Sequence, residues 1–279
     1  MRSRQSWLLS NEMVELSPSR DFKIIDETDE YAVVDKPPFL LIHPTKPDGR
    51  RSLWHELREL FAFEIAAGGQ VSIINRLDRE TSGLVLVAKK ADVARRFGLL
   101  MQQQQLQKEY FATVWGWPDW ENRFVDAPLT RQGKHQHSAI WLKQTIHPSG
   151  SPAQTEFHVQ RRFVRSLQSR QALPHTGDDL SRAGTPEAEK FALIRAVPHT
   201  GRTHQVRVHL ASLGHAIVGD KIYGPDDQHY LRFIETGWTS ALEHHLLLPR
   251  HALHSAKLAI AGEREWISPL PPDLVDFVG

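Results

Sequence analysis

Apolar residues in this chain come in short runs that polar or Gly/Pro-containing segments separate. Residues 71–74 and 84–88 are two such runs of strand length, so the polar segment 75–82 between them is predicted to be a loop. No run approaches the roughly 20 apolar residues that a membrane-spanning helix needs. The 279 residues, 40% of them hydrophobic, are therefore expected to bury a core built from short elements.

Helical and strand periodicities both occur, which predicts a fold that contains both kinds of element. Ser52 can cap a helix, because apolar residues at helical spacing follow it. These residues are Leu53, Leu57, Leu60 and Phe61. Thr203 can likewise cap a helix at 204–213 that Gly214 ends, although 203–210 also alternates like a strand. The other predicted elements are strands at 23–25, 31–34 and 110–115 and a helix at 91–104.

The chain divides into a short arm and one domain. Residues 1–20 show no sustained hydrophobic period and are predicted to form an N-terminal arm, and residues 21–279 are predicted to form a single domain. Within the domain, residues 166–189 are polar and aperiodic and contain Gly and Pro. We expect this segment to be an excursion from the fold.

Composition excludes several classes of chemistry. The chain has no cysteine, which removes disulfides, zinc ribbons, iron–sulfur clusters and thiol nucleophiles. The first apolar stretch ends at Leu9, too early for a secretory signal, so a cytoplasmic protein is expected. The histidines lack metal-ligand spacing, and no Gly-rich phosphate loop or dinucleotide fingerprint occurs. We therefore expect neither a metal nor a cofactor.

The charges are balanced overall but segregated along the chain. Lys and Arg number 34 and Asp and Glu 33, a formal charge of +1 that does not by itself indicate a nucleic-acid partner. Residues 157–177 carry four arginines and no acid, whereas 21–30 carry five acids and one lysine. The arginines are Arg161, Arg162, Arg165 and Arg170. This segregation fits a basic groove, and it equally fits a solvated helix face with a basic loop.

The predicted loop at 75–82 holds the first candidate for chemistry. Asp78 stands between Arg76 and Arg79, and positive charge nearby favours the ionised carboxylate. Such a carboxylate can act as a nucleophile or a base. The alternative is an ordinary surface aspartate that makes ion pairs.

The second candidate segment is 199–209. Arg202 precedes the predicted helix and Arg207 lies one turn into it, so both can project from its N-terminal end toward one anion. A phosphate or a catalytic carboxylate would suit that position. Alternatively, the two arginines satisfy structural acids.

Taken together, these segments resemble the RluA-type RNA pseudouridine synthases. The matching motifs, in family order and spacing, are VVDKPPFLLIHP, INRLDRETSGLVLVAKK, KEYFATVWG, HTGRTHQVRVHLASLGHAIVGDKIYG, LHSAKL and PLPPDL. The match runs from about residue 22 to the C-terminus. It implies an α+β fold with a central mixed, largely antiparallel β-sheet and flanking helices and loops, the pseudouridine synthase fold, with residues 21–279 as the catalytic domain.

The resemblance also implies an activity: isomerisation of specific uridines in structured RNA, in tRNA or large-subunit rRNA or both, by a monomer without cofactor. Asp78 matches the catalytic aspartate of the family, and Arg207 matches the arginine that pairs with it. Tyr110 matches the tyrosine that packs on the target base and is a candidate for the later proton removal. The aspartate either attacks the sugar or assists elimination.

Further residues are expected to contact RNA. Arg76 matches an arginine that helps to displace the target nucleotide, and Arg202, Lys108 and the basic run near Arg161 are weaker candidates for phosphate contacts. Asn75 departs from the family, which mostly has histidine there, so any function of a charged histidine at this position is in doubt.

Many relatives carry a small RNA-binding module ahead of the catalytic domain, and the first twenty residues are too few to hold one. A compact stem-loop is therefore the expected partner. Two rival functions stay open: a catalytically silent RNA-binding protein with the same fold, and a nucleoside or glycoside hydrolase, which needs a second carboxylate.

Overall fold

The computed structural model describes residues 22–44, 51–166 and 188–279. The predicted arm at 1–20 lies outside the described residues, as does most of the predicted excursion at 166–189. The ends of that excursion, Ser166, Ala188 and Glu189, belong to strands.

One sheet of ten strands forms the centre of the molecule, in the order β1-β2-β4-β11-β5-β10-β9-β6, with β12 paired to β11 and β3 to β4. The strands are β1 (Lys23–Glu27), β2 (Tyr31–Lys36), β3 (Ser72–Ile73), β4 (Ser82–Ala88), β5 (Leu106–Trp115), β6 (Asn122–Asp126), β9 (Gln154–Ser166), β10 (Ala188–Pro198), β11 (Leu253–Ile260) and β12 (Arg264–Ile267). Only β4 and β11 pair in parallel; the other pairs are antiparallel. The predicted mixed, largely antiparallel sheet is confirmed.

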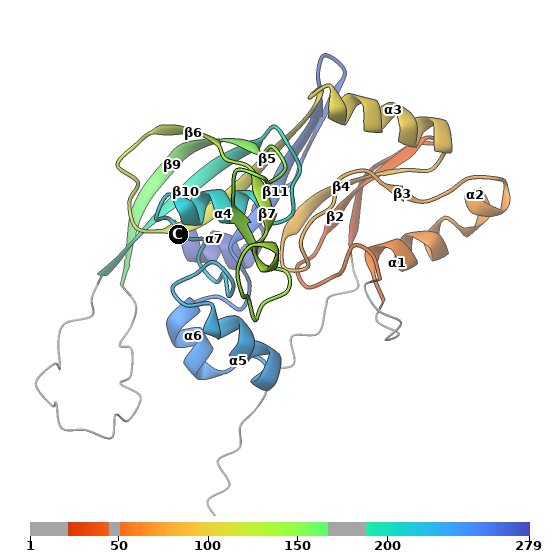
Figure 1. The fold of residues 1–279 in the computed structure, drawn as a ribbon. Helices are drawn as coiled ribbons and strands as arrows, with labels where there is room; N and C mark the ends of the chain where they lie inside the picture. Colours follow the sequence, from red (N-terminus) through yellow and green to blue (C-terminus); the bar gives the residue numbers. More distant parts are fainter. Residues whose placement is uncertain (1–21, 45–50, 167–187) are drawn as a thin grey trace, which may run out of the picture.

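Helices and a small second sheet flank this sheet (Figure 1). The helices are α1 (Leu53–Leu60), α2 (Ala62–Ala66), α3 (Ala91–Gln102), α4 (Gln205–Ser212), α5 (Gln228–Thr236), α6 (Ser240–Leu246) and α7 (Pro272–Val278), with a 3-10 turn at Gln132–Lys134. The second sheet pairs β7 (Leu129–Arg131) with β8 (Gln144–Ile146). None of the helices in the described ranges is long and apolar enough to cross a membrane.

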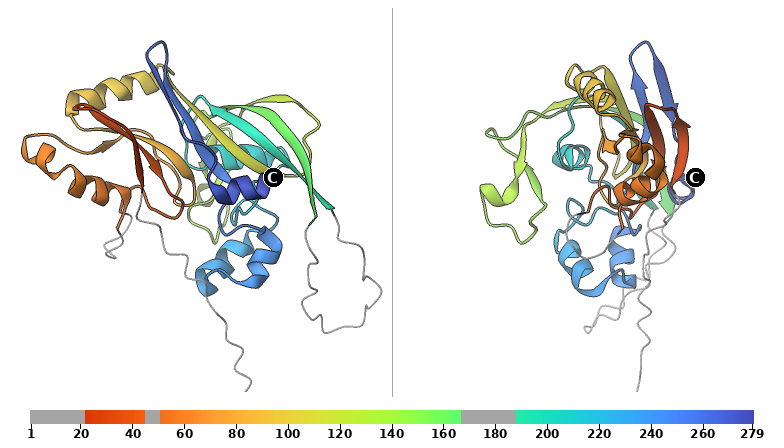
Figure 2. Two further views of the ribbon diagram at one scale, coloured as in Figure 1. Left: turned by 180° about the vertical axis from the view of Figure 1, so that it is seen from behind. Right: turned by 90° about the vertical axis from the view of Figure 1, so that its right-hand side faces the viewer.

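Strands β2 and β4 are buried on both faces, which explains their apolar runs at 31–34 and 84–88. Alternate residues point to opposite faces: Val34 belongs to the core cluster that contains α1, and Val33 to the cluster that contains α3. Both views in Figure 2 agree that α3 and the α1–α2 pair lie on opposite sides of these strands. The β11–β12 hairpin extends the α3 cluster, since Trp266 packs there.

Gly83, the second residue of β4, determines how the chain enters this strand from the predicted loop. Its φ is +109°, and a Cβ at this position would lie 2.3 Å from the carbonyl oxygen of Ser255 in β11. The hydroxyls of Thr81 and Ser82 do not tie back their own loop, as a local turn would; they hydrogen-bond His251 (2.7 Å) and His254 (2.9 Å). The loop is thus fixed to the segment around β11.

The helix at α4 is confirmed, but its predicted cap is wrong. His204, with φ of +57°, is the N-cap and makes no side-chain capping bond. The Gln205 side chain organises the turn ahead of the helix, because its Oε1 accepts from the backbone N–H of Arg202 (3.0 Å) and from the hydroxyl of Thr200 (2.7 Å). Gly214 has the expected positive φ of +80°.

The other helices deviate from prediction at their ends. Ser52 occupies the N-cap of α1, as predicted, but makes no side-chain capping bond, and its hydroxyl contacts His55 instead. Leu60, one of the apolar residues at helical spacing, is 49% exposed, because the chain turns into α2 directly after it. Helix α3 ends at Gln102, two residues before the predicted end.

Candidate active site

A cavity of about 610 Å³ opens between the loop after β3, strand β5 and the segment that leads into α4. It brings together most of the site residues that the sequence predicted, although they come from three separate parts of the chain. The predicted residues that line it are Arg76, Asp78, Lys108, Tyr110, Arg202 and Arg207.

Asp78 meets Arg207 inside this cavity. The Asp78 side chain is 26% exposed, and its Oδ2 accepts a hydrogen bond from Nη1 of Arg207 at 2.8 Å. Arg207 also donates from Nε and Nη2 to the two oxygens of Asp220, at 2.6 and 2.9 Å. Asp220 is fully buried and accepts backbone N–H groups of Ile222 and Tyr223 as well. The guanidinium is therefore a rigid bridge between a buried carboxylate and a partly exposed one.

The charges keep Asp78 ionised. Burial works to raise its pKa, but His204, Arg207 and His251 lower it, and the pKa ends far below its ordinary value. His204 itself has a pKa lowered to about 4 by burial and by Arg207, so at neutral pH the positive charge that faces Asp78 is that of Arg207. Burial would lower the pKa of Arg207, yet Asp220 and Asp78 raise it well above its ordinary value.

The positive charge beside Asp78 does not come from the arginines next to it in the sequence, as the local pattern predicted. Neither Arg76 nor Arg79 pairs with Asp78 in the described structure; Arg79 donates from Nε to the carbonyl of Phe39 at 3.3 Å. The partner, Arg207, lies 129 residues away in the sequence. Of the two arginines predicted to face one anion, Arg207 pairs with Asp78, whereas Arg202 donates from Nε to the carbonyl of Pro152 at the same cavity.

The loop that carries Asp78 is anchored by contacts of the two residues that follow it, Arg79 and Glu80. Glu80 accepts from Nζ of Lys221 at 2.8 Å, and its carbonyl oxygen accepts from Arg250 at 3.3 Å. Lys36, fully buried at the end of β2, donates to the carbonyl of Arg79 at 3.3 Å and to those of Pro37 and Leu40. Burial and the charge of Arg250 lower the pKa of Lys36 to about 7.

Asn75 has a structural function. Its Nδ2 donates to the carbonyl of Leu84 at 3.0 Å, and its Oδ1 accepts the backbone N–H of Leu86 at 2.7 Å. The amide thus satisfies main-chain groups of β4 at the start of the loop. A neutral side chain that both donates and accepts suits this position without any titration.

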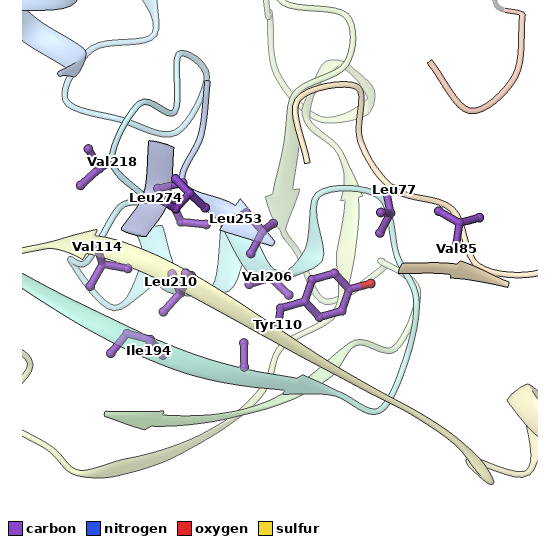
Figure 3. Close-up of a cluster of buried hydrophobic side chains, with 14 of the residues drawn as sticks. Leu77, Val85, Tyr110, Val114, Ile194, Val206, Leu210, Val218, Leu253 and Leu274 are labelled. Atoms are coloured by element: carbon purple, nitrogen blue, oxygen red, sulfur yellow. The ribbon is translucent and has the colours of Figure 1, made fainter. Parts of the chain in front are cut away.

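Tyr110 belongs to both the core and the cavity wall. It is 8% exposed, and Figure 3 shows its ring among Leu77, Val206 and Leu253. Burial, with a smaller effect of the Asp78 charge, raises the pKa of Tyr110 to about 12. The Tyr110 hydroxyl therefore keeps its proton at neutral pH.

The predicted RNA-contacting residues differ in their surroundings. Arg76 is exposed at the cavity, whereas Lys108 is 7% exposed and donates to the carbonyl of Thr200 at 3.3 Å. Burial and the neighbouring Arg202 lower the pKa of Lys108 to about 8. Arg76, Lys108 and Arg202 all border the cavity that holds Asp78.

The basic run near Arg161 is occupied by contacts within the protein. Arg161 donates to the carbonyl of Gly279, and Arg165 to carbonyls at the end of α7. Arg162 pairs with Glu121 and donates to two nearby carbonyls. Arg170 lies outside the described residues.

Sequence reasoning missed several residues around Asp78. Asp220, His204 and Tyr223 all lie within the long motif that the resemblance used, yet no function was assigned to them. Tyr223 contacts His204, whose Nε2 lies 3.9 Å from Oδ2 of Asp78. In the described parts of the chain, no three His, Asp or Glu side chains are grouped as a metal site.

Comparisons with known proteins agree with this geometry. The family model described as RNA pseudouridylate synthase matches residues 30–212. The chain is 29% identical over 260 residues to a ribosomal large subunit pseudouridine synthase D of Nitrosomonas europaea, covering 90% of this chain and 63% of that protein. It is 30% identical over 218 residues to the dual-specificity RNA pseudouridine synthase RluA of Vibrio vulnificus, covering 77% of this chain and 75% of the relative.

The fold is likewise shared. The structure of human RNA pseudouridylate synthase domain containing 1 superposes with a TM-score of 0.62 at 21% identity, covering 93% of this chain and 89% of that one. The chain spans 63% of the length of each of the first two curated relatives. Because the family model matches more than half of the residues of this chain, the chain belongs to the RNA pseudouridylate synthase family, among the RluA-type members.

Proposed function

We propose that this protein isomerises specific uridines in structured RNA to pseudouridine, with Asp78 as the catalytic carboxylate. The observation that carries the proposal is the ion pair of Asp78 and Arg207 inside the cavity. Family membership supports the reaction type. The name of one relative refers to the large ribosomal subunit, which supports large-subunit rRNA as a substrate. The proposed substrate is a stem-loop of that RNA or of tRNA.

The reaction breaks the N1–C1′ bond of uridine and forms a C5–C1′ bond. The bonding electrons leave with the base, which turns and presents C5 to C1′; C5 then loses a proton and N1 gains one. Asp78 acts on the electron-poor sugar, by attack at C1′ or by assisting elimination, and both routes require a charged carboxylate. Arg207 maintains that charge and fixes one oxygen.

The base must leave its stack to reach Asp78. A cavity of about 610 Å³ is of a size suited to a flipped nucleotide, since small-ligand sites span roughly 300–1,000 Å³. Tyr110 presents a neutral ring in the wall for contact with the uracil. Arg76, Arg202 and Lys108 are proposed to contact the RNA backbone. All these groups come from one chain, which supports a monomer as the working unit.

A tritium-release assay tests the proposal. The substrate is total RNA from cells that lack the gene, labelled with tritium at C5 of uridine, because C5 exchanges its hydrogen only when the new bond forms. We expect release by the wild type and by Asp92→Ala, an exposed acid on α3. Release is expected to vanish in Asp78→Ala.

The other outcomes separate the rivals. Equal release by Asp78→Ala would refute Asp78 as the catalytic residue. Free uracil in the products would indicate a hydrolase. Specific RNA binding without either product would indicate a silent RNA-binding protein with the same fold.

A further inference from the structure

His204 is a buried side chain beside Asp78 to which the reaction above assigns nothing. It occupies the N-cap of α4 in a left-handed conformation, with φ of +57°. Its side chain is 7% exposed and lines the cavity. A non-glycine residue held in this conformation carries strain, and such strain concentrates at functional sites.

Hydrogen bonds to Tyr223 determine which ring nitrogen of His204 carries the proton. The backbone N–H of Gln144 donates to the Tyr223 hydroxyl oxygen at 2.8 Å. The same hydroxyl lies 2.8 Å from Nδ1 of His204, the one acceptor for its proton among the described residues. Burial raises the pKa of Tyr223, so the phenol keeps that proton, and the acceptor within hydrogen-bond distance of it is Nδ1 of His204. Nδ1 is then the acceptor, and the proton of the neutral ring lies on Nε2.

The protonated nitrogen faces the catalytic carboxylate. Nε2 of His204 lies 3.9 Å from Oδ2 of Asp78, the same oxygen that Arg207 holds at 2.8 Å. None of the residues that the structure describes donates a hydrogen bond to Oδ1. An N–H at 3.9 Å acts on the carboxylate electrostatically, and a shift of about 1 Å would make it a hydrogen bond.

We propose that His204 is a positioning residue: as a neutral Nε2–H donor it holds Oδ2 of Asp78 together with Arg207, and it leaves Oδ1 as the oxygen that meets the ribose. This inference rests on the proposed function. A neutral donor orients the carboxylate without adding a second positive charge that would weaken its attack. The charged or titratable groups that face the imidazole are Asp78, Arg207, Asp220 and Tyr223.

Two substitutions of matched shape test the donor. His204→Gln keeps an N–H donor at the end of the side chain, and His204→Met replaces it with an apolar end of similar length. Both variants bear the same left-handed strain, so the strain cancels in the comparison. We expect His204→Met to lower kcat by about 10- to 100-fold relative to His204→Gln, with KM within about twofold, as for one hydrogen bond to a charged group. Equal kcat values, or a difference confined to KM, would overturn the proposal.

A second measurement does not depend on activity. In protein labelled with ¹⁵N-histidine, the His204 signals are assigned by their loss in His204→Gln, and long-range ¹H–¹⁵N couplings report the tautomer. We expect the neutral Nε2–H form at neutral pH in the wild type, and a shift toward the Nδ1–H form in Tyr223→Phe, which removes the donor to Nδ1. An Nδ1–H or doubly protonated ring in the wild type would contradict the inference even if the protein isomerises uridine. Absence of isomerisation with the Nε2–H form intact would instead contradict the proposed function.

Discussion

Arg207 is the residue on which both the charge and the geometry of the site depend. It joins Asp220, which is fully buried, to Asp78, which is 26% exposed. Removal of one partner from a buried ion pair leaves an uncompensated charge, and this costs more than the pair contributes when intact. Substitutions of Arg207 therefore affect stability as well as catalysis.

Arg207→Met is expected to lower the free energy of unfolding by about 3–5 kcal/mol, because the Asp220 carboxylate would stay buried without its guanidinium. Urea denaturation measures this loss. Adding Asp220→Asn to the variant removes the orphaned charge and is expected to recover part of the stability, while catalysis stays low. No recovery in the double variant would show that Asp220 is not the main cause of the loss.

Tyr110 is expected to bind the target base through its ring. Tyr110→Phe should keep RNA affinity within about twofold, whereas Tyr110→Ala should weaken it by about 1–3 kcal/mol, the range for loss of stacking on one base. Fluorescence anisotropy with a labelled substrate stem-loop measures both. If Tyr110→Ala binds as tightly as Tyr110→Phe, Tyr110 serves the core and not the base.

The lowered pKa of Lys108 predicts that RNA binding depends on pH. Its pKa in the free protein is about 8, so it loses its positive charge as the pH rises through that value. If bound phosphate restores the ordinary pKa, affinity should fall by up to about tenfold between about pH 7 and about pH 9. Lys108→Arg, which stays charged, should remove most of this fall, and an unchanged profile in that variant would argue against a phosphate contact by Lys108.

At the scale of elements, the close approach of β4 to β11 positions the loop that carries Asp78. Gly83→Ala is expected to destabilise the protein by about 1–3 kcal/mol, because the new Cβ meets the Ser255 carbonyl and the φ of Gly83 is unfavourable for alanine. Gly98→Ala in α3 is the matched control. A Cβ added at Gly98 would have open space around it, and the substitution should stabilise the helix by about 0.5–1 kcal/mol. Thermal unfolding of both variants checks the contrast; equal effects would contradict it.

Elements with strong periodicity were predictable, and the side-chain hydrogen bonds at their N-termini were not. The buried strand β4 and helix α3 follow from apolar runs and helical spacing that need no distant partner. The start of α4 did not follow from the capping preference of Thr203, because His204 adopts a left-handed conformation there and the Gln205 side chain binds to β9. Exposure of Leu60 likewise depends on where the chain turns next.

At the scale of the whole molecule, the active site depends on contacts that local sequence does not encode. Asp78 and Arg207 lie 129 residues apart, and the local argument assigned the counter-charge to the arginines beside Asp78. Only the resemblance of two long motifs to a family paired the right residues. His204 was missed because the tautomer of an imidazole depends on a hydroxyl that the fold brings to it.

The central claim is that the Asp78 carboxylate converts uridine to pseudouridine in cellular RNA. The most direct measurement maps pseudouridine across total RNA from cells without the gene, complemented with the wild type or with Asp78→Asn, which keeps the size of the side chain and removes its charge. We predict that at least one position loses pseudouridine in the deletion strain and regains it with the wild type but not with Asp78→Asn. Restoration by Asp78→Asn at that position, or an unchanged map in the deletion strain, would contradict the claim.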